Sequence, residues 1–263
     1  MSLRHAEREF NRMGLKGLAR AISGIRQELK DRKNIEDIAL PELGKNGSKK
    51  PKEAVSYVSA LLPEYQTKPH TRELVTSLWK AIWMEEGRKI GAKIQVPLVD
   101  RTEEEIKELE EQGRMMIYVP QKVATQGTRH LLGRIFPKMQ NHSVKKDNSV
   151  TNEGVEGGWF DIESSPDSPN LKTTEDDLRE LFKSQGKQGQ SLSQYIVGSQ
   201  FLKLTTGHYF DEITYSRLLD SRYVGYVVYA DFGRDGSLFV DWDLDPSDRL
   251  DRWGGRSSGV KKA

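Results

Sequence analysis

The sequence predicts an α+β fold, in which a mainly helical N-terminal region, residues 1–92, precedes a region that contains strands, residues 93–263. Two observations predict this class. Through much of the first third of the chain, apolar residues recur at steps of three and four, which is typical of amphipathic helices. Near the C-terminus, two segments alternate between apolar and polar residues on either side of an Asp-Gly turn, which is typical of a β-hairpin.

Three helices are predicted in the N-terminal region. They extend from Arg4 to Asp31, from Glu53 to Leu62, where a proline follows, and from about Thr71 to Gly91. In the last of these, Trp79 and Trp83 are four residues apart and therefore lie on one side of the helix. Such a pair is more often core packing than a ligand platform, so we expect both indoles to be buried.

The N-terminal region is basic. Residues 1–50 carry 12 Lys and Arg against 7 Asp and Glu, a local net charge of +5, whereas the whole chain has a net charge of only +2. A basic segment suits an anionic partner such as a nucleic acid. It also suits a solvated helix face, which is the more frequent reason for a run of charges. The solvated face is favoured, and nucleic-acid association through this region stays as the alternative function.

Between the N-terminal region and the hairpin, short elements of both kinds are expected. Residues Lys93 to Val99 alternate weakly and contain a proline, so they are predicted to form an edge strand or an extended linker. Thr102 to Glu105 form a capping box that opens a short helix. The other elements expected here are a strand at Met115–Val119, a long loop at 138–158, a strand at Trp159–Ile162, a helix that begins near Thr173–Asp176 and a helix at Ser191–Leu204.

The predicted hairpin has strands at Tyr226–Phe232 and Leu238–Trp242. Because side chains alternate between the two sides of a strand, each strand has an apolar side and a mixed side. The apolar side is expected to face the core and consists of Val228, Ala230, Phe232, Leu238, Val240 and Trp242. The mixed side is expected to be exposed and consists of Tyr229, Asp231, Phe239, Asp241 and Asp243. Aromatic rings and carboxylates gathered on one exposed surface indicate a binding face.

Aromatic residues are concentrated in this part of the chain. Ten of the 22 Phe, Trp and Tyr residues lie between Tyr209 and Trp253. Residues 221–252 also hold seven Asp against four Arg, a net charge of −3. Tyrosine supplies a large contact area at a small entropic cost, and Asp and Ser add polar contacts, as in antibody paratopes. The negative charge disfavours nucleic acid and suits a protein surface with basic patches.

Two further C-terminal patterns have both a structural and a ligand-binding interpretation. The Gly-Gly turn after Trp253 is expected to place this ring in the core and Arg256 on a carboxylate, rather than to form a ligand site. The run from Asp241 to Asp248 resembles the start of a calcium loop, but Pro246 and Arg252 stand where an EF-hand needs Gly and Glu. Exposed carboxylates of a binding face are therefore favoured over calcium ligands.

The C-terminal part of the chain resembles the end of a C-type lectin-like domain of the formylglycine-generating-enzyme type. The segments that carry the resemblance are Tyr209-Phe210, Tyr215-Ser-Arg217, Val227–Phe232, Gly236–Trp242 and Arg256–Lys261. Among proteins with such a domain, the chain is most similar to the variable proteins of diversity-generating retroelements from uncultured candidate-phylum bacteria. In those proteins a reverse transcriptase rewrites adenine-containing codons near the 3′ end of the gene, so that contact positions vary on a fixed scaffold.

The resemblance implies a lectin-like fold for residues 93–263, with a variable segment at about 209–263. It also implies a non-enzymatic function, the binding of varied partners that are expected to be proteins. Together with the alternation along the strands, it gives the expected contact residues, which are Tyr215, Arg217, Tyr223, Tyr226, Tyr229, Asp231, Arg234, Phe239, Asp241, Asp243, Arg249 and Asp251.

Several function classes are excluded or disfavoured by composition. The chain has no cysteine, which excludes disulfides, thiolate metal sites and a cysteine nucleophile. Enzymes of the resembling fold need cysteines for copper binding and catalysis, so that activity is excluded. The five histidines show no metal-ligand spacing and no phosphate-binding loop occurs, so neither metal nor cofactor is predicted. A hydrolase or transferase on another fold stays as a further alternative, which a pocket with convergent carboxylates of perturbed pKa would favour.

The start of the chain and its hydropathy bear on location. No apolar run approaches the length of a membrane span, and no signal-peptide pattern opens the chain. A cytoplasmic location, or one that the sequence leaves unassigned, is therefore expected.

Overall fold

The computed structural model describes residues 56–124, 129–141, 150–153, 157–242, 245 and 247–260. The chain divides into two compact units, residues 1–54 and 55–263, and the described residues belong to the second. The helix predicted at residues 4–31 and the candidate contact residue Asp243 lie outside the described residues. The described unit combines helices and strands, which confirms the α+β class.

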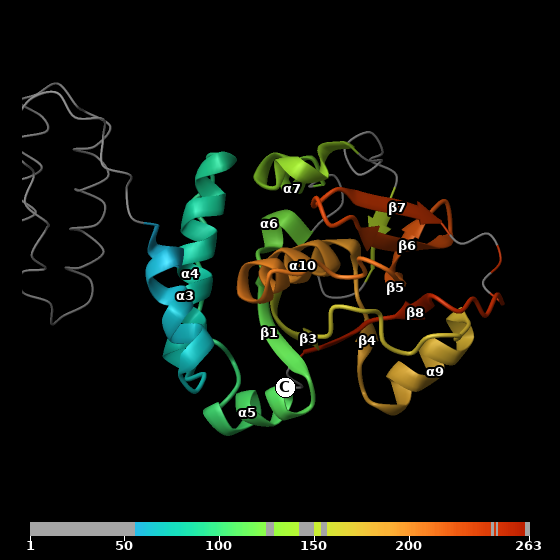
Figure 1. Ribbon diagram of the computed structural model, residues 1–263, viewed down its shortest axis with the longest axis horizontal. Coiled ribbons are helices and arrows are strands. Elements are labelled where there is room, and N and C mark those ends of the chain that lie inside the picture. The colour runs from blue at the N-terminus through green and yellow to red at the C-terminus, as the bar shows by residue number, and fades with distance from the viewer. Residues whose placement is uncertain are drawn as a thin grey trace, which may run out of the picture. The chain divides into compact units, whose positions relative to one another are not determined.

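Helices and strands follow one another along the described part of the chain (Figure 1). The helices are α3 (Tyr57–Thr67), α4 (Arg72–Lys89), α5 (Glu103–Glu111), α6 (Gln121–Ala124), α7 (Arg129–Ile135), the 3-10 helix η1 (Pro137–Asn141), α9 (Glu175–Ser184) and α10 (Leu192–Thr206). The strands are β1 (Arg114–Val119), β2 (Val150–Asn152), β3 (Gly158–Glu163), β4 (Gln188–Gly189), β5 (Tyr215–Tyr223), β6 (Tyr226–Phe232), β7 (Leu238–Trp242), β8 (Trp253–Gly255) and β9 (Ser257–Gly259).

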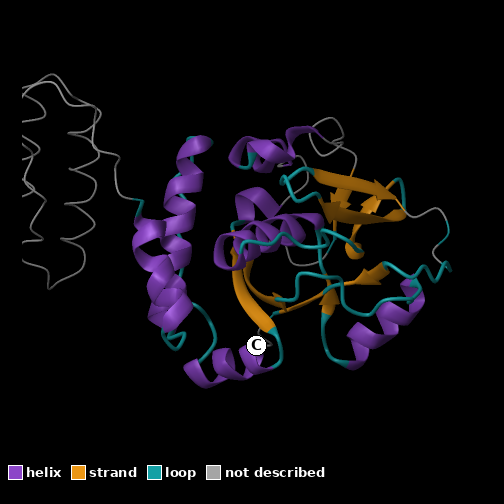
Figure 2. Cartoon of the chain, in the orientation of Figure 1, coloured by secondary structure: helices purple, strands orange, loops and turns teal. Residues whose placement is uncertain are grey.

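The strands form two sheets, and the helices lie around them (Figure 2). The first sheet has the order β1-β3-β9-β4 and is antiparallel. The second has the order β2-β5-β6-β7, and β8 pairs with β5 in parallel. Helix α10 packs against both β1 and β5 and so lies between the sheets (Figure 1). The C-terminal segment, residues 253–259, crosses from the second sheet to the first, because it contains both β8 and β9.

Side-chain caps fix where the helices begin. A hydroxyl at the N-cap position accepts a hydrogen bond from a backbone N–H of the first turn, which satisfies a donor that the helix itself leaves unpaired. The N-cap residues are Thr71 for α4, Thr102 for α5, Thr174 for α9 and Ser191 for α10. The last three are capping boxes, in which an acidic or amide side chain bonds back to the N-cap backbone. The predicted starts of these helices are confirmed.

Helix α3 does not end before Pro63, as the sequence predicted, but continues to Thr67. A proline inside a helix removes one backbone hydrogen bond and costs roughly 3 kcal/mol. Tertiary packing beyond the proline offsets this cost, because Tyr65 is buried. Its ring stacks on His70 at 3.8 Å between centroids and meets Phe201 of α10 edge-on at 5.6 Å.

The predicted boundary after residue 92 does not separate compact units, because α4 belongs to the same core as the first sheet. Trp79 and Trp83 are both buried, as predicted. The Trp79 indole N–H donates to the carbonyl oxygen of Met116 at 3.1 Å, and that of Trp83 donates to the carbonyl of Tyr118 at 2.9 Å. Both acceptors lie in β1, so α4 is fixed to that strand by two buried hydrogen bonds as well as by its apolar surface. The division of the chain falls after residue 54 instead.

The hairpin of β6 and β7 has the predicted bounds and the predicted inner side. Five of its inner residues are buried, namely Val228, Ala230, Phe232, Leu238 and Val240. The sixth prediction was wrong, because Trp242 is 38% exposed. Trp242 is the last residue of β7 and lies opposite Val228, so its ring extends past the end of the core and stacks on Tyr223 at 4.3 Å.

Candidate binding face

Strand pairing places rings and carboxylates on the outer side of the second sheet. Asp231 on β6 lies opposite Phe239 on β7, and Tyr229 lies opposite Asp241. On its other edge β6 pairs with β5, where Tyr229 lies opposite Arg217. Directly opposed residues of an antiparallel pair project to the same side of the sheet. The aromatic face, as the term is used below, consists of Tyr215, Tyr229, Asp231, Phe239, Asp241 and Trp253.

The four rings of the aromatic face form one cluster with Tyr229 at its centre. The centroid of the Tyr229 ring lies 4.2 Å from that of Trp253, 6.1 Å from that of Tyr215 and 6.2 Å from that of Phe239. Tyr215 and Trp253 also meet, at 6.0 Å. Separations of this size are typical of favourable ring pairs. Phe239 is 40% exposed, so the cluster lies at the surface of the protein.

Trp253 belongs to this face and not to the core, which corrects the expectation from the sequence. It is half-buried, and the parallel pairing of β8 with β5 places it opposite Tyr215. The glycine that follows allows this approach, because a Cβ at Gly254 would overlap the carbonyl oxygen of Pro169. The Gly-Gly dipeptide was the available signal, but it does not indicate which strand β8 would join.

Arg217 was predicted to be a contact residue at the surface, and this prediction was wrong. Its register does place it on the outer side of β5, but its side chain is fully buried. The guanidinium donates to the carbonyl oxygens of Thr173 and, at 2.9 Å, Asp248. It also lies 5.1 Å from the centroid of the Trp253 ring. The Arg217 guanidinium therefore packs against the Trp253 ring in a cation–π contact.

Helix α9 covers the rest of the outer side of the sheet. Leu178 and Phe182 of α9 form a small buried cluster with Leu219 of β5 and Val227 of β6. Val227 lies on the same side of β6 as Tyr229, two residues away. The outer side is thus divided between a part closed by α9 and the open aromatic face.

The two carboxylates of the face have different surroundings. Asp241 Oδ1 accepts a hydrogen bond from the backbone N–H of Trp242 at 2.9 Å. The Oδ1 atom of Asp231 is buried and has no hydrogen-bond partner among the described residues. Burial, and secondarily the negative charge of Asp211, raise the pKa of Asp231 from 3.8 to about 6. Asp231 is therefore an acceptor with an unfilled hydrogen-bonding position at the face.

Tyr223 and Tyr226, also predicted as contacts, lie at the other end of the sheet. They pair with each other across β5 and β6, on the same side as Val228, and Tyr223 carries the exposed Trp242 ring. Tyr226 is 45% exposed. These rings are separate from the aromatic face, so the structure does not bring all predicted tyrosines together.

The remaining predicted contacts lie in loops and hold ion pairs. Arg234, in the turn between β6 and β7, pairs with Glu212 at 3.5 Å. Arg249 pairs with Asp177 of α9 at 2.8 Å, and Asp251 pairs with Lys172 at 3.1 Å. All three predicted residues are exposed, and exposed pairs of this kind contribute at most about 1 kcal/mol each to stability.

A buried polar network lies on the inner side of β5. Asp211 accepts hydrogen bonds from Arg256 at 2.8 Å, Tyr195 at 2.9 Å and Ser216 at 2.7 Å. Arg256 therefore lies on a carboxylate, as the sequence predicted, and it also donates to two backbone carbonyls. Burial, and secondarily the charge of Asp211, raise the pKa of Tyr195 well above its usual value. With both charges of the pair bonded in place, this network is a scaffold rather than a set of free acid and base groups.

A second buried polar network links strands β1, β3 and β9 of the first sheet. The buried Arg114 of β1 is paired with Asp161 and, at 3.0 Å, with Glu163, both on β3. It also donates to the hydroxyl of Ser257 on β9 at 3.0 Å. Each charge again has a partner, so this cluster holds the C-terminal segment in place.

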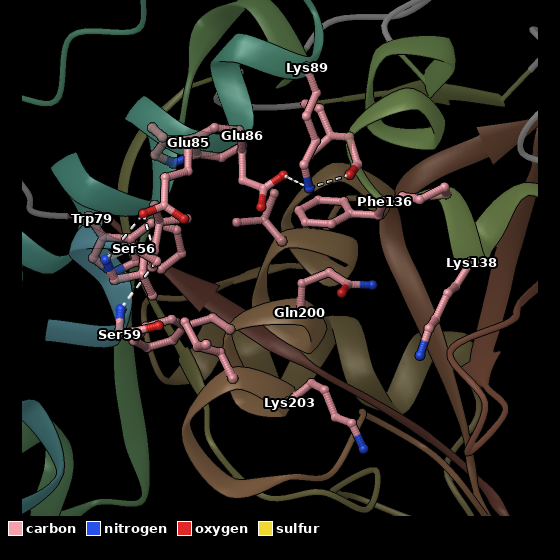
Figure 3. A pocket seen from close by; sticks show the side chains of 18 of the residues that line it. Ser56, Ser59, Trp79, Glu85, Glu86, Lys89, Phe136, Lys138, Gln200 and Lys203 are labelled. Carbon is pink, nitrogen blue, oxygen red and sulfur yellow. Dashed lines mark hydrogen bonds and ion pairs between the residues drawn. The ribbon is translucent and has the colours of Figure 1, made fainter. Parts of the chain in front are cut away.

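A cavity of about 470 Å³ lies apart from the aromatic face, between the α3–α4 pair and α10 (Figure 3). Its walls include Trp79, Phe136 and Leu204. Lys89 and Glu86 face each other at its edge, with Lys89 Nζ 2.5 Å from Glu86 Oε2 and 3.0 Å from the Ile135 carbonyl oxygen (Figure 3). The cavity does hold two neighbouring carboxylates, Glu85 and Glu86, and burial raises the pKa of Glu86. Glu85 accepts a hydrogen bond from the Ser56 hydroxyl at 2.7 Å and Glu86 pairs with Lys89, so both carboxylates are engaged within the protein.

Comparison with known proteins identifies no relative of this chain. No family model matches the chain, and no curated protein or solved structure matches it either.

Within the described ranges, no group of three His, Cys, Asp or Glu side chains could hold a metal ion. None of the helices in those ranges has both the length and the hydropathy that crossing a membrane requires. The basic residues 1–50, on which the nucleic-acid alternative depends, lie outside the described part.

Proposed function

We propose that this chain is a non-enzymatic binding protein whose aromatic face recognises a partner protein. The observation that carries the proposal is that strands β6 and β7 have two chemically different sides. On β6 and β7 one side is a buried core, while the other presents Tyr229, Asp231, Phe239 and Asp241 at the surface. Contiguous aromatic patches that remain at the surface of a folded protein mark interaction sites.

The chemistry of the face suits a protein surface better than a small metabolite. Tyr and Trp bury a large area on binding while losing few rotamers, and they dominate hot spots of protein interfaces. Strands backed by a bonded core hold these side chains in place before binding, which lowers the entropic cost of association. The surplus of acidic residues in 221–252 would be complementary to a basic partner surface.

As part of the same proposal, the face is the variable surface of a lectin-like domain of a diversity-generating retroelement. The resemblance of residues 209–263 suggests this, and the alternation along β6 and β7 supports it. Exposed positions alternate with buried ones. A substitution at an exposed position such as Phe239 is expected to change the free energy of unfolding by less than about 0.5 kcal/mol. Arg217 is not among those positions, because it is buried.

The genomic neighbourhood tests the retroelement part of the proposal. We expect a near-repeat of the gene's 3′ end beside a gene for a reverse transcriptase, with mismatches at adenines in the codons of exposed positions such as Tyr229 and Phe239. Mismatches spread equally over those codons and over the codons of Val228 and Ala230 would contradict it.

The binding part is tested with the full chain immobilised as bait in a lysate of the cells that carry the gene. The double variant Tyr229→Ala, Phe239→Ala removes two rings of the face. Tyr57→Ala is the matched control, because Tyr57 on α3 is a ring of similar exposure, 49%. A partner should be retained by the wild type and by Tyr57→Ala and lost from the double variant. Equal retention by all three baits would mean that the face is not the binding site.

A further inference from the structure

The aromatic face alternates rings with carboxylates in both directions. Asp231 lies opposite Phe239 on one edge of β6, and continuing the register of Ser216 with Ala230 places Tyr215 opposite it on the other edge. One step along the sheet the order reverses, since Tyr229 lies opposite Asp241. Diagonal neighbours across paired strands are within reach of aromatic and long side chains. Any group seated over Asp231 would therefore meet ring surfaces on two sides.

Asp231 also lacks the hydrogen bond that a buried carboxylate normally has. Its Oδ1 atom is buried without a partner in the described part of the chain. Two buried carboxylates of the described residues are bonded by contrast, Asp211 to Arg256 and Asp161 to Arg114. Asp231 as a whole is only half-buried, so the accessible part of its carboxylate can accept hydrogen bonds from a ligand, and no donor of the described residues reaches Oδ1 to compete for the charge.

Two further acids lie near Asp231. Asp211, from the loop beneath, opposes its ionisation, and Asp241 on β7 is a further acid on the same side of the sheet. Arg217 on β5 is held by backbone carbonyls, and Arg234 in the adjoining turn is paired with Glu212. The cations of these two elements are therefore engaged elsewhere, and the position over Asp231 suits a cation from outside.

Resting on the proposed function, we propose that the aromatic face receives an arginine side chain of the partner, with its guanidinium bonded to Asp231 and stacked against the rings of Tyr215, Tyr229 and Phe239. A guanidinium fits this surface because it is planar, stacks on rings and donates in a fork that matches a carboxylate. An ammonium group lacks the planar surface, so lysine is the poorer ligand for this face.

Protonation of Asp231 would oppose this binding. With a pKa of about 6 in the free protein, the carboxyl is mostly ionised at pH 7 and mostly neutral at pH 5. Only the ionised form pairs with a guanidinium, so the dissociation constant should rise about tenfold between pH 7 and pH 5.

Acetyl-arginine-amide is the probe for the experiment, titrated into the full chain and followed by the NMR signal of the Trp253 indole N–H. Acetyl-citrulline-amide is the matched control, because it has nearly the same shape and no charge. Asp231→Asn removes the proposed anion, and Phe239→Leu removes a ring while keeping apolar volume. Glu108→Gln on the exposed side of α5 is the control variant, since it changes the net charge equally and lies on an element away from the face.

We expect arginine to bind the wild type and Glu108→Gln about tenfold more tightly than citrulline, with a smaller gain for acetyl-lysine-amide. Asp231→Asn should lose this preference and the pH dependence, and Phe239→Leu should weaken binding several-fold, with dispersed NMR spectra showing that both variants fold. Equal affinity for arginine and citrulline, an undiminished preference in Asp231→Asn, or no binding by the wild type would overturn the inference. The bait experiment with Tyr229→Ala, Phe239→Ala is independent of the probe, so it separates failure of this inference from failure of the proposed function.

Discussion

At the scale of single residues, Asp231 carries a cost in stability that its substitution should remove. Burial raises its pKa to about 6, so the folded protein binds a proton more tightly than the unfolded chain does. Proton binding by Asp231 therefore stabilises the folded protein at pH 4, and this stabilisation is lost as the pH rises through 6. Asp231→Asn should increase the free energy of unfolding by about 1 kcal/mol at pH 7, after allowance for partial exposure, and leave it unchanged near pH 4.

Urea denaturation of both proteins at pH 4 and pH 7 measures this difference, with Glu108→Gln as the control of equal charge. A gain that is the same at both pH values would show that the raised pKa is not its cause. A variant that is more stable and yet binds less well would also identify Asp231 as a residue kept for binding.

The sequence correctly predicted which side of the sheet the hairpin residues occupy, but it did not predict that Arg217 is buried. The difference has a physical origin. Period-two alternation within β6 and β7 is local, so it placed Tyr229, Asp231, Phe239 and Asp241 together. The burial of Arg217 depends on carbonyls of residues 173 and 248, which are far from it along the chain. A local pattern carries no information about such covering segments.

At the scale of elements, the approach of β8 to its neighbours depends on glycine. A Cβ at Gly254 would overlap a backbone carbonyl, that of Pro169, which cannot move aside as the end of a side chain could. Gly254→Ala should therefore lower the free energy of unfolding by about 1 to 3 kcal/mol and displace Trp253 from the aromatic face.

Thermal unfolding and the fluorescence of Trp253 measure the two effects. Gly133→Ala is the comparison, since Gly133 lies in helix α7 with open space where a Cβ would be placed, and alanine there should be neutral or mildly stabilising. If the two variants were equally stable, β8 would be able to accommodate a Cβ at residue 254, contrary to the structure.

The strands that the sequence did not predict are those that lack a regular period. Strand β5 reads Tyr-Ser-Arg-Leu-Leu-Asp-Ser-Arg-Tyr, and its register with β6 shifts between Leu218 and Arg222. Such an irregularity breaks the alternation on which strand prediction relies. Strands β4, β8 and β9 have two or three residues each, rich in Gly and Ser, and are held by pairing with distant strands. By contrast, capping signals are local, and they located the starts of α5 and α9.

At the scale of the whole molecule, truncation can test where along the chain the compact unit begins. A chain of residues 55–263 should keep a cooperative thermal transition, because the unit is closed on itself. A chain of residues 93–263 loses α3 and α4, which removes the Trp79 and Trp83 hydrogen bonds to β1 and uncovers Phe201, whose ring lies 4.6 Å from that of Trp79.

We expect the shorter chain to aggregate or to melt without cooperativity, as judged by circular dichroism and size-exclusion chromatography. A well-folded 93–263 chain would restore the boundary that the sequence suggested after residue 92. Failure of the 55–263 chain alone would instead mean that the first 54 residues are needed for folding.

The position of residues 253–259 in the chain determines when the aromatic face can be complete. Residues 253–259 supply Trp253 to the face, Arg256 to Asp211 and β9 to the first sheet, and they follow the β6–β7 hairpin in the order of synthesis. The nascent chain can form the β6–β7 hairpin earlier, but it cannot complete the ring cluster. A product cut short by a stop codon before residue 253 would lack the same ring and the same ion pair. The aromatic face is thus completed only after residue 253 has been added, and under the proposed function a partner would engage only chains that contain this segment.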